Sequence, residues 1–507
     1  MCGIAGIWRS PDSLAVGQMM NVLAHRGPDD TGMYSSSTGG ILGHRRLSIM
    51  DRSGGHQPIK RIGDNCAIAA NGEIYNFAQL RDDLANKHFF RTRSDSESAL
   101  HLYRETGIDA AKQLDGMFAL AIADGEELYL ARDPLGIKPL YYGQHYDSLV
   151  FASELKALHG CVEEAHEFPP GTWFHSRYGF QRYYEVPDVS PMSDSLSEHL
   201  RNVRFTLEQA VVKRLMSDVP VGAFLSGGLD SSIIAAIARL HLDELHTFSV
   251  GIEGSRDIQA ARLVARHLDT IHHEYVFTPD DALAALPEII YHLESFDQDL
   301  VRSAIPCYFA SRLASEFVKV ILTGEGADEL FAGYKYYRKI RCPKQLQGEL
   351  QRSVRSLHNI NLQRVDRLTM AHSIEGRVPF LDLDLVRVAL AIPPDLKLSE
   401  NENGQLIDKW ILRKAFEDLL PSQIVWRDKE QFDEGSGTTE FLADAVCRWM
   451  TACDAQQYVR THRQAGYDQL KNAFITSCSL KLFLAHNAFC QTWPHSRTGG
   501  NMAHEEE

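Results

Sequence analysis

A segment rich in proline, serine and aspartate, EVPDVSPMSDSLSE, divides the chain into two halves with different hydrophobic patterns. Before it, short β-forming runs alternate with turns, and helical stretches interrupt them around residues 12–24 and 77–105. This pattern predicts a first domain of the α+β class, with antiparallel sheets and helices in layers. We place the first domain at residues 1–185, the linker at 186–198 and the second domain at 199–507.

The second half alternates between apolar runs typical of buried strands and amphipathic runs typical of helices. VPVGAFL, HTFSVGI and HHEYVF read as strands, whereas SIIAAIARLHL and DIQAARLVARHL read as helices. A further strand, FVKVILTG, follows. This βαβαβ order predicts an α/β domain with a mainly parallel sheet covered by helices on both faces. Residues 340–500 should be mostly helical, and the polar tail at about 495–507 should be disordered.

Charge and composition exclude several classes of protein. The formal net charge of −15 over 507 residues argues against nucleic acid or an anionic membrane as the main partner. No apolar run reaches the ~18 residues that a membrane span needs, so we expect a cytoplasmic protein. The nine cysteines are irregularly spaced, which predicts neither disulfides nor a structural zinc site. One of them, Cys2, stands beside the chain end, where most chains fray, and this position indicates chemistry.

The stretch LSGGLDSS, residues 225–232, stands between a predicted strand and a predicted helix. Its glycines let the backbone approach a ligand, while serine hydroxyls and helix N-terminal amides supply donors for an anion. This arrangement predicts a phosphate cradle of neither the Walker nor the GxGxxG type. Asp230 beside phosphates fits a bridging Mg²⁺. The alternative is a plain glycine turn with a serine N-cap.

The stretch LTGEGADELFAGY follows another predicted strand, whose carboxyl end should lie near the first loop. Asp328 could complete a Mg²⁺ site, and Glu325 could orient an amine or move a proton. Capping of a helix by acidic residues is the alternative, above all for Glu329. Downstream, Arg427 and Lys429 are cations that could neutralise phosphate, although lone basic residues usually face solvent.

The motifs SGGLDSS, GEGADELFAGY, HSIEGRVPFLD and WRDKEQF occur in an order and spacing that resemble those of glutamine-dependent asparagine synthetases. The resemblance covers nearly the whole chain. It implies an N-terminal Ntn-type glutaminase, an αββα sandwich, and a C-terminal domain related to the ATP pyrophosphatases. It also implies that ATP and Mg²⁺ activate aspartate as aspartyl-AMP, that ammonia from glutamine then displaces AMP, and that the enzyme is a homodimer.

By this resemblance Met1 is removed and Cys2 becomes the N-terminal nucleophile that attacks the glutamine amide. Its free α-amine, with a pKa ordinarily near 7.7–8.0, can act as the base for its own thiol. In NGEIYN, the Asn71 side-chain amide and the Gly72 N–H are the expected oxyanion donors. An Asn-Gly hairpin turn is the alternative for this pair.

Glutamine also needs partners for its α-carboxylate and its α-ammonium. We assign Arg46 to the carboxylate, because the family pattern R-L-S-I selects it over Arg45. Glu73 and Asp95 are assigned to the ammonium. Arg26 and the run at residues 132–142 also match the family, and we expect them to support the fold and the domain interface.

In the second domain the resemblance assigns an ATP site, a metal site and an acceptor site. The expected ATP-binding residues are Leu225, Ser226, Gly227, Gly228, Asp230, Ser231, Val250 and Gly324. The expected catalytic residues are Glu325 and Lys429, the metal ligands Asp230 and Asp328, and the acceptor-binding residues Arg302, Glu325, Asp366 and Arg367. Helical surface pairs would look the same as Asp366 and Arg367 in sequence.

One departure from the family pattern concerns the region that borders the acceptor pocket. Asp299 and Leu300 stand where some bacterial relatives carry two threonines, and a carboxylate beside a site for an anionic amino acid is unfavourable unless Arg302 or Mg²⁺ offsets it. The alternative function is therefore an amide synthetase that acts on another carboxylic acid.

Three further hypotheses are less compatible with the sequence. A glutaminase coupled to a sugar isomerase or phosphoribosyl transferase would lack SGGLDSS, and a β-lactam-forming relative would not need Cys2. A non-catalytic protein would have lost the chemical residues. Because escaping ammonia would be protonated in water, we also predict an internal tunnel lined by small or apolar side chains from both domains.

Overall fold

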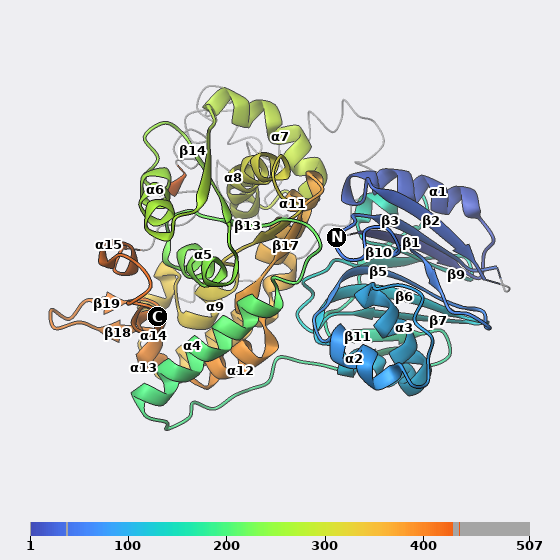
Figure 1. Cartoon of the computed structure of the whole chain (residues 1–507), viewed down its shortest axis with the longest axis horizontal. Helices are drawn as coiled ribbons and strands as arrows, with labels where there is room; N and C mark the ends of the chain where they lie inside the picture. The colour runs from blue at the N-terminus through green and yellow to red at the C-terminus, as the bar shows by residue number, and fades with distance from the viewer. Residues whose placement is uncertain (1, 37–38, 429–434, 437–507) are drawn as a thin grey trace, which may run out of the picture.

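The structure is a computed structural model that describes residues 2–36, 39–428 and 435–436. Two domains lie side by side, and the N-terminal end of the chain lies at the boundary between them (Figure 1). No helix in the described part is long and apolar enough to cross a membrane. The predicted disordered tail, the predicted helices beyond residue 436 and Lys429 lie outside the described residues.

The N-terminal domain contains two six-stranded sheets, and every pair of neighbouring strands is antiparallel. The first has the order β10-β8-β9-β1-β3-β2, with β1 (Gly3–Trp8), β2 (Asp30–Ser35), β3 (Ile41–Arg46), β8 (Tyr141–His145), β9 (Ser148–Ala152) and β10 (Ala165–Glu167). The second has the order β12-β11-β7-β6-β5-β4, with β4 (Ile59–Lys60), β5 (Cys66–Ile74), β6 (Gly116–Asp124), β7 (Glu127–Arg132), β11 (Thr172–His175) and β12 (Gly179–Arg182).

Side-chain alternation along the central strands explains the layers of this domain. In β6, Ala119 and Ala121 face the core between the sheets, whereas Leu120 and Ile122 face a second core beneath α2 (Phe77–Leu84) and α3 (Asp95–Thr106). A third core joins α1 (Ser13–Val22) to the first sheet. Small alanines let the two sheets approach closely, and larger side chains meet the helices. The predicted αββα sandwich is confirmed.

The helical stretch predicted around residues 77–105 is two helices, not one. Residues 85–94 separate α2 from α3. There Arg91 and Thr92 donate their backbone N–H groups to Glu97 in the first turn of α3, so the carboxylate fixes the connection that leads into this helix.

The C-terminal domain is built on a five-stranded, fully parallel sheet of order β15-β14-β13-β16-β17. Its strands are β13 (Val221–Phe224), β14 (His246–Gly251), β15 (Ile271–Val276), β16 (Val320–Leu322) and β17 (Glu375–Arg377). The strand β17 lies in the HSIEGRVPF motif, and the sequence pattern does not predict it. The remaining strands form a short hairpin, β18 (Ser399–Glu400) and β19 (Leu406–Ile407).

Helices cover both faces of this sheet, as predicted (Figure 1). Ala223 and Leu322 pack into a core with α5 (Leu229–His241), while Phe248 and Ile321 pack toward α8 (Gln298–Ser315). The α-helices in the described part of the domain are α4 (Leu196–Lys213), α5 (Leu229–His241), α6 (Arg256–Leu268), α7 (Pro279–Leu293), α8 (Gln298–Ser315), α9 (Ala327–Phe331), α10 (Pro343–Arg355), α11 (Asn361–Ala371), α12 (Leu383–Ala391), α13 (Pro394–Lys397), α14 (Trp410–Ala415) and α15 (Ser422–Val425).

The connection between the domains has no helix or strand from the end of β12 at Arg182 to the start of α4 at Leu196. The predicted linker overlaps this stretch and the first turn of α4. That helix begins with a capping box. The Ser195 hydroxyl accepts the Glu198 N–H, and the Glu198 carboxylate accepts the Ser195 N–H.

Buried ion pairs hold the domains together. Arg26 donates to Glu154 at 2.6 Å and, across the interface, to Asp366 at 2.8 Å. Arg367 also crosses, donating to the Ser153 carbonyl at 3.2 Å, and Lys138 donates to the Gly376 carbonyl at 3.3 Å. Arg26 and the run 132–142 thus contribute to the interface, as the sequence predicted.

A second interdomain contact predicts a pH dependence of stability. Glu167 accepts from Arg132 at 2.7 Å, and His358 of the other domain lies 2.8 Å from the same carboxylate. Burial alone would raise the pKa of Glu167, but Arg132 and His358 outweigh it and lower this pKa to about 2. Because the folded-state pKa lies below that of the unfolded chain, this stabilisation is present above about pH 4.5 and is lost as the pH falls toward 2.

We therefore expect Glu167→Gln to lower the free energy of unfolding by about 2 kcal/mol at pH 7. The difference from the wild type should shrink between pH 4.5 and 2, measured by chemical denaturation across that range. Glu163→Gln, a nearby exposed position, is the matched control and should stay within about 0.5 kcal/mol of the wild type. A difference that does not change with pH would contradict this assignment.

Candidate functional site

The N-terminal site forms around Cys2, the residue that precedes β1. Its backbone nitrogen donates to Asn71 Oδ1 at 2.9 Å, and Arg26 Nε donates to its carbonyl oxygen at 3.0 Å. Burial raises the pKa of the Cys2 thiol above its ordinary value. The Leu47 N–H and the Arg46 charge offset only part of this rise. A residue next to a chain end is thus fixed on several sides, as a nucleophile must be.

Asn71 and Gly72 lie inside the nine-residue strand β5, so the alternative of an Asn-Gly hairpin turn is wrong. The bond from Cys2 fixes the Asn71 amide and leaves its Nδ2 with no hydrogen-bond partner among the described residues. Gly72 has φ +144°, and a Cβ there would lie 1.9 Å from the Met117 carbonyl oxygen, so only glycine fits. A free, buried donor beside the thiol is what an oxyanion needs.

The residues assigned to glutamine recognition lie in the same region and are buried. Arg46, at the end of β3, donates to the carbonyls of Met50 and Asp51 at 2.9 and 2.7 Å. Asp95, at the start of α3, accepts from the Ile74 N–H at 2.7 Å. Burial raises the pKa of Asp95, and it raises that of Glu73 well above its usual range. An arriving ammonium group would offset this cost.

The C-terminal domain also contributes to this site, which sequence reasoning missed. From β17, Arg377 lies 3.4 Å from Glu73 and donates to Glu375 at 2.6 Å. Arg377 and Glu375 both belong to the HSIEGRVPF motif. The tunnel stays a prediction, and the side chains that β17 brings to this boundary, Glu375 and Arg377, are charged rather than small or apolar.

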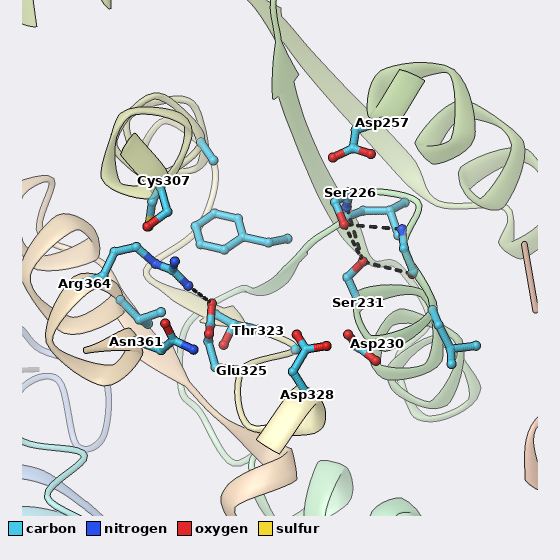
Figure 2. Close-up of a pocket in the computed structure, with 18 of the residues that line it drawn as sticks. Ser226, Asp230, Ser231, Asp257, Cys307, Thr323, Glu325, Asp328, Asn361 and Arg364 are labelled. Carbon is cyan, nitrogen blue, oxygen red and sulfur yellow. Dashed lines mark hydrogen bonds and ion pairs between the residues drawn. The ribbon is translucent and has the colours of Figure 1, made fainter. Parts of the chain in front are cut away.

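The second site is a cavity of about 450 Å³ at the carboxyl ends of the parallel strands, where such sheets bind ligands. It brings together most residues that the sequence assigned to ATP, metal and acceptor (Figure 2). The predicted residues that line it are Leu225, Ser226, Gly228, Asp230, Ser231, Val250, Arg302, Gly324, Glu325 and Asp328.

The loop before α5 is tightly wound. The Ser226 and Ser231 hydroxyls lie 3.2 Å apart, and Ser226 Oγ accepts the Gly228 N–H at 3.3 Å. Gly227 has φ +70°, and a Cβ there would lie 2.4 Å from the Ala260 Cβ. Gly227 does not line the cavity, but its carbonyl accepts from Arg427 at 3.3 Å. The loop thus presents hydroxyls and the N-terminal amides of a 13-residue helix to an anion.

The acceptor side of the cavity differs from the prediction. Glu325 accepts from Arg364 Nη2 at 2.5 Å, and Arg364 lies on α11 beside the cavity (Figure 2). Asp366 and Arg367 follow on the same helix but point to the domain interface, where they pair with Arg26 and Glu294. The structure does not bring these two predicted residues to the cavity, because a helix turns by about 100° per residue.

Sequence reasoning missed other residues that line the cavity. Arg364, Asn361 and Cys307 face it (Figure 2), and Lys409 reaches it from the start of α14. Of these residues, only Arg364 gave a sequence signal, because it stands two positions before Asp366 in a segment predicted to be helical. Asp299 also lines the cavity, and its carboxylate lies 3.6 Å from Arg302.

Comparisons with known proteins agree with this geometry. A family model described as asparagine synthase matches residues 202–351 and 339–486, and one described as a glutamine amidotransferase domain matches residues 1–196. Glutamine-hydrolyzing asparagine synthetase 1 of Arabidopsis thaliana is 40% identical over 461 residues, covering 86% of this chain and 78% of that protein. The corresponding enzyme of Triphysaria versicolor is 41% identical with the same coverage.

A probable glutamine-hydrolyzing asparagine synthetase of Dictyostelium discoideum is 40% identical over 477 residues, which cover 86% of this chain and 85% of that protein. The two family models match in the order of the two domains, and each of these relatives covers 86% of this chain. The chain therefore belongs to the family of glutamine-hydrolysing asparagine synthetases.

Proposed function

We propose that this protein makes asparagine from aspartate, with glutamine as the nitrogen donor and ATP as the activating substrate. The observation that carries the proposal is the pairing of two sites in one chain: a fixed Cys2 beside a free amide donor, and a cavity at the ends of parallel strands that the loop from Ser226 to Ser231 lines. The products would be asparagine, glutamate, AMP and pyrophosphate.

The first half-reaction uses Cys2 after removal of Met1. The backbone nitrogen that donates to Asn71 Oδ1 is then the α-amine, which takes the thiol proton as sulfur attacks the glutamine amide carbon. Asn71 Nδ2 and the Gly72 N–H stabilise the oxyanion. The α-ammonium passes this proton to the amide nitrogen, which leaves as ammonia, and water then hydrolyses the thioester to glutamate. Arg46, Glu73 and Asp95 would hold the α-groups of glutamine.

The second half-reaction uses the cavity of the C-terminal domain. The loop from Ser226 to Ser231 and the start of α5 would hold the ATP phosphates, so that the aspartate side-chain carboxylate attacks the α-phosphate and releases pyrophosphate. Ammonia then attacks the aspartyl-AMP, and AMP leaves. Ammonia gains positive charge and must lose a proton, which the Glu325 carboxylate would accept. Lys429 stays a predicted partner of the phosphates.

The residues present fit a magnesium ion. The carboxylates of Asp230 and Asp328 face one another (Figure 2) and converge on one cationic atom, the Nζ of Lys409, at 2.5 and 2.6 Å. Magnesium binds one or two carboxylates together with substrate phosphates, and when bound it would neutralise charge on the pyrophosphate.

The alternative, amidation of a different carboxylic acid, rests on Asp299 in the cavity wall. Its carboxylate lies near Arg302, and this cation offsets the added charge that made aspartate unfavourable. We therefore favour aspartate. The proposal also includes a homodimer, which the family resemblance implies, and a cytoplasmic location. Sedimentation analysis tests the dimer.

The decisive experiment mixes the purified protein with glutamine, ATP and Mg²⁺, with or without aspartate, and measures AMP, pyrophosphate and asparagine together. We expect asparagine and AMP in near-equal amounts only when aspartate is present. Glutamine hydrolysis without aspartate-dependent AMP would overturn the acceptor assignment and leave the N-terminal site standing. A panel of other carboxylic acids would then identify the acceptor.

A further inference from the structure

Lys409 occupies the centre of the proposed metal site. Its Nζ lies 2.5 Å from Asp230 Oδ2 and 2.6 Å from Asp328 Oδ1. The lysine side chain is 2% exposed and lines the cavity. The two carboxylates come from the first turns of α5 and α9, which are far apart in sequence, and the ammonium neutralises part of their charge.

The local fold is arranged to hold this lysine. Lys409 has φ +51°, a left-handed conformation that non-glycine residues rarely adopt, and its N–H donates to the Phe331 carbonyl at 3.2 Å. A Cβ at Gly333 would lie 2.1 Å from the Lys409 Cε and 1.9 Å from Asp328 Oδ1. Glycine at 333 therefore keeps the space that the bridge needs.

The ammonium and a divalent cation would compete for the same oxygens. Two converging carboxylates attract any small cation, and a tethered ammonium has an advantage over an ion from solution. Among the described residues there is no group of three or more histidine, cysteine or acidic side chains that could hold a metal alone. Further oxygen ligands must therefore come from elsewhere, and nucleotide phosphates supply them.

We propose that Lys409 is a built-in counter-ion that excludes divalent metal from the Asp230–Asp328 pair until the metal arrives together with ATP. This inference rests on the ATP and metal sites of the proposed function. The phosphates add oxygen ligands for the metal and negative charge for the displaced ammonium, so the exchange becomes favourable only with nucleotide. Metal binding by this site is thus nucleotide-dependent.

The test is Mn²⁺ binding to the full-length protein, followed by electron paramagnetic resonance, with and without a non-hydrolysable ATP analogue. The wild type should bind Mn²⁺ at least tenfold more tightly with the analogue. Lys409→Met should bind Mn²⁺ without nucleotide at least tenfold more tightly than the wild type does. Lys409→Arg, which keeps the charge, should behave like the wild type, as should Lys414→Met, a partly exposed lysine within α14, the helix that Lys409 precedes.

Two outcomes would overturn the inference: equal Mn²⁺ affinity of the wild type with and without the analogue, or a folded Lys409→Met that gains no affinity. Circular dichroism establishes folding, and the wild-type comparison decides by itself if Lys409→Met does not fold. Adding Asp230→Asn to Lys409→Met should remove the gained affinity. Wild type that binds no Mn²⁺ even with the analogue would instead refute the metal site of the proposed function.

Discussion

Replacing Cys2 with serine is expected to lower glutamine-dependent asparagine formation by on the order of 10³-fold or more, because the nucleophile of the first half-reaction is lost. Synthesis from added ammonium salts should stay within about twofold of the wild type, since the cavity of the C-terminal domain does not contain Cys2. The measurement is asparagine formation with glutamine and with ammonium chloride, under the same ATP and aspartate concentrations.

The matched control is Cys342→Ser, an exposed free cysteine before α10. It should leave both activities unchanged. If Cys2→Ser kept its glutamine-dependent activity, another residue would have to be the nucleophile. If it lost both activities, Cys2 would matter for the fold of the two domains together, and the chemical assignment would fail.

Replacing Asp366 with asparagine is expected to lower the free energy of unfolding by about 3–5 kcal/mol, because it leaves buried cations without their partner. Asp366 accepts from Arg26 at 2.8 Å and lies 3.6 Å from Arg367 and 4.0 Å from Lys138. Burial raises the pKa of Asp366, but Arg26 and Lys138 outweigh it and lower this pKa below its usual range. Chemical denaturation measures the loss.

The same variant tests whether Asp366 binds the acceptor, as the sequence predicts, or stabilises the domain interface, where the structure places it. With ammonia as the nitrogen source, the KM for aspartate should stay within about twofold, because the carboxylate points to the domain interface. A tenfold rise in that KM with unchanged stability would restore the predicted acceptor role. Asp384→Asn, an exposed acid on α12, is the control and should change stability by less than about 0.5 kcal/mol.

Local patterns predicted much of the fold. The period-2 alternation of β6 separates alanines from larger apolar residues, and this alternation decides which face of the strand meets the first sheet. The strand β17 was missed because its three residues, Glu375–Arg377, include two charged side chains that are fully buried. Their burial depends on partners in the other domain and around α4, which no local pattern contains.

The two sites, like the fold, were predictable from the sequence only where neighbouring residues form them. The loop at residues 225–232 was predictable because glycines, hydroxyls and the start of a helix stand next to one another in sequence. Lys409 was not, because its importance comes from two carboxylates that are 179 and 81 positions away. Nor could the sequence tell which of Arg364, Asp366 and Arg367 faces the cavity, since the orientation of α11 depends on what packs around it.

By itself, the sequence determined the two domains, the nature of each sheet and the place of the glycine-serine loop between a strand and a helix, because these depend on short-range periodicity and on residues that are neighbours in the chain. Only the tertiary structure decided which charges meet across the interface, which residues of α11 reach the cavity and what cation stands between Asp230 and Asp328. Buried charges must find their partners in space, and sequence separation carries no information about those distances.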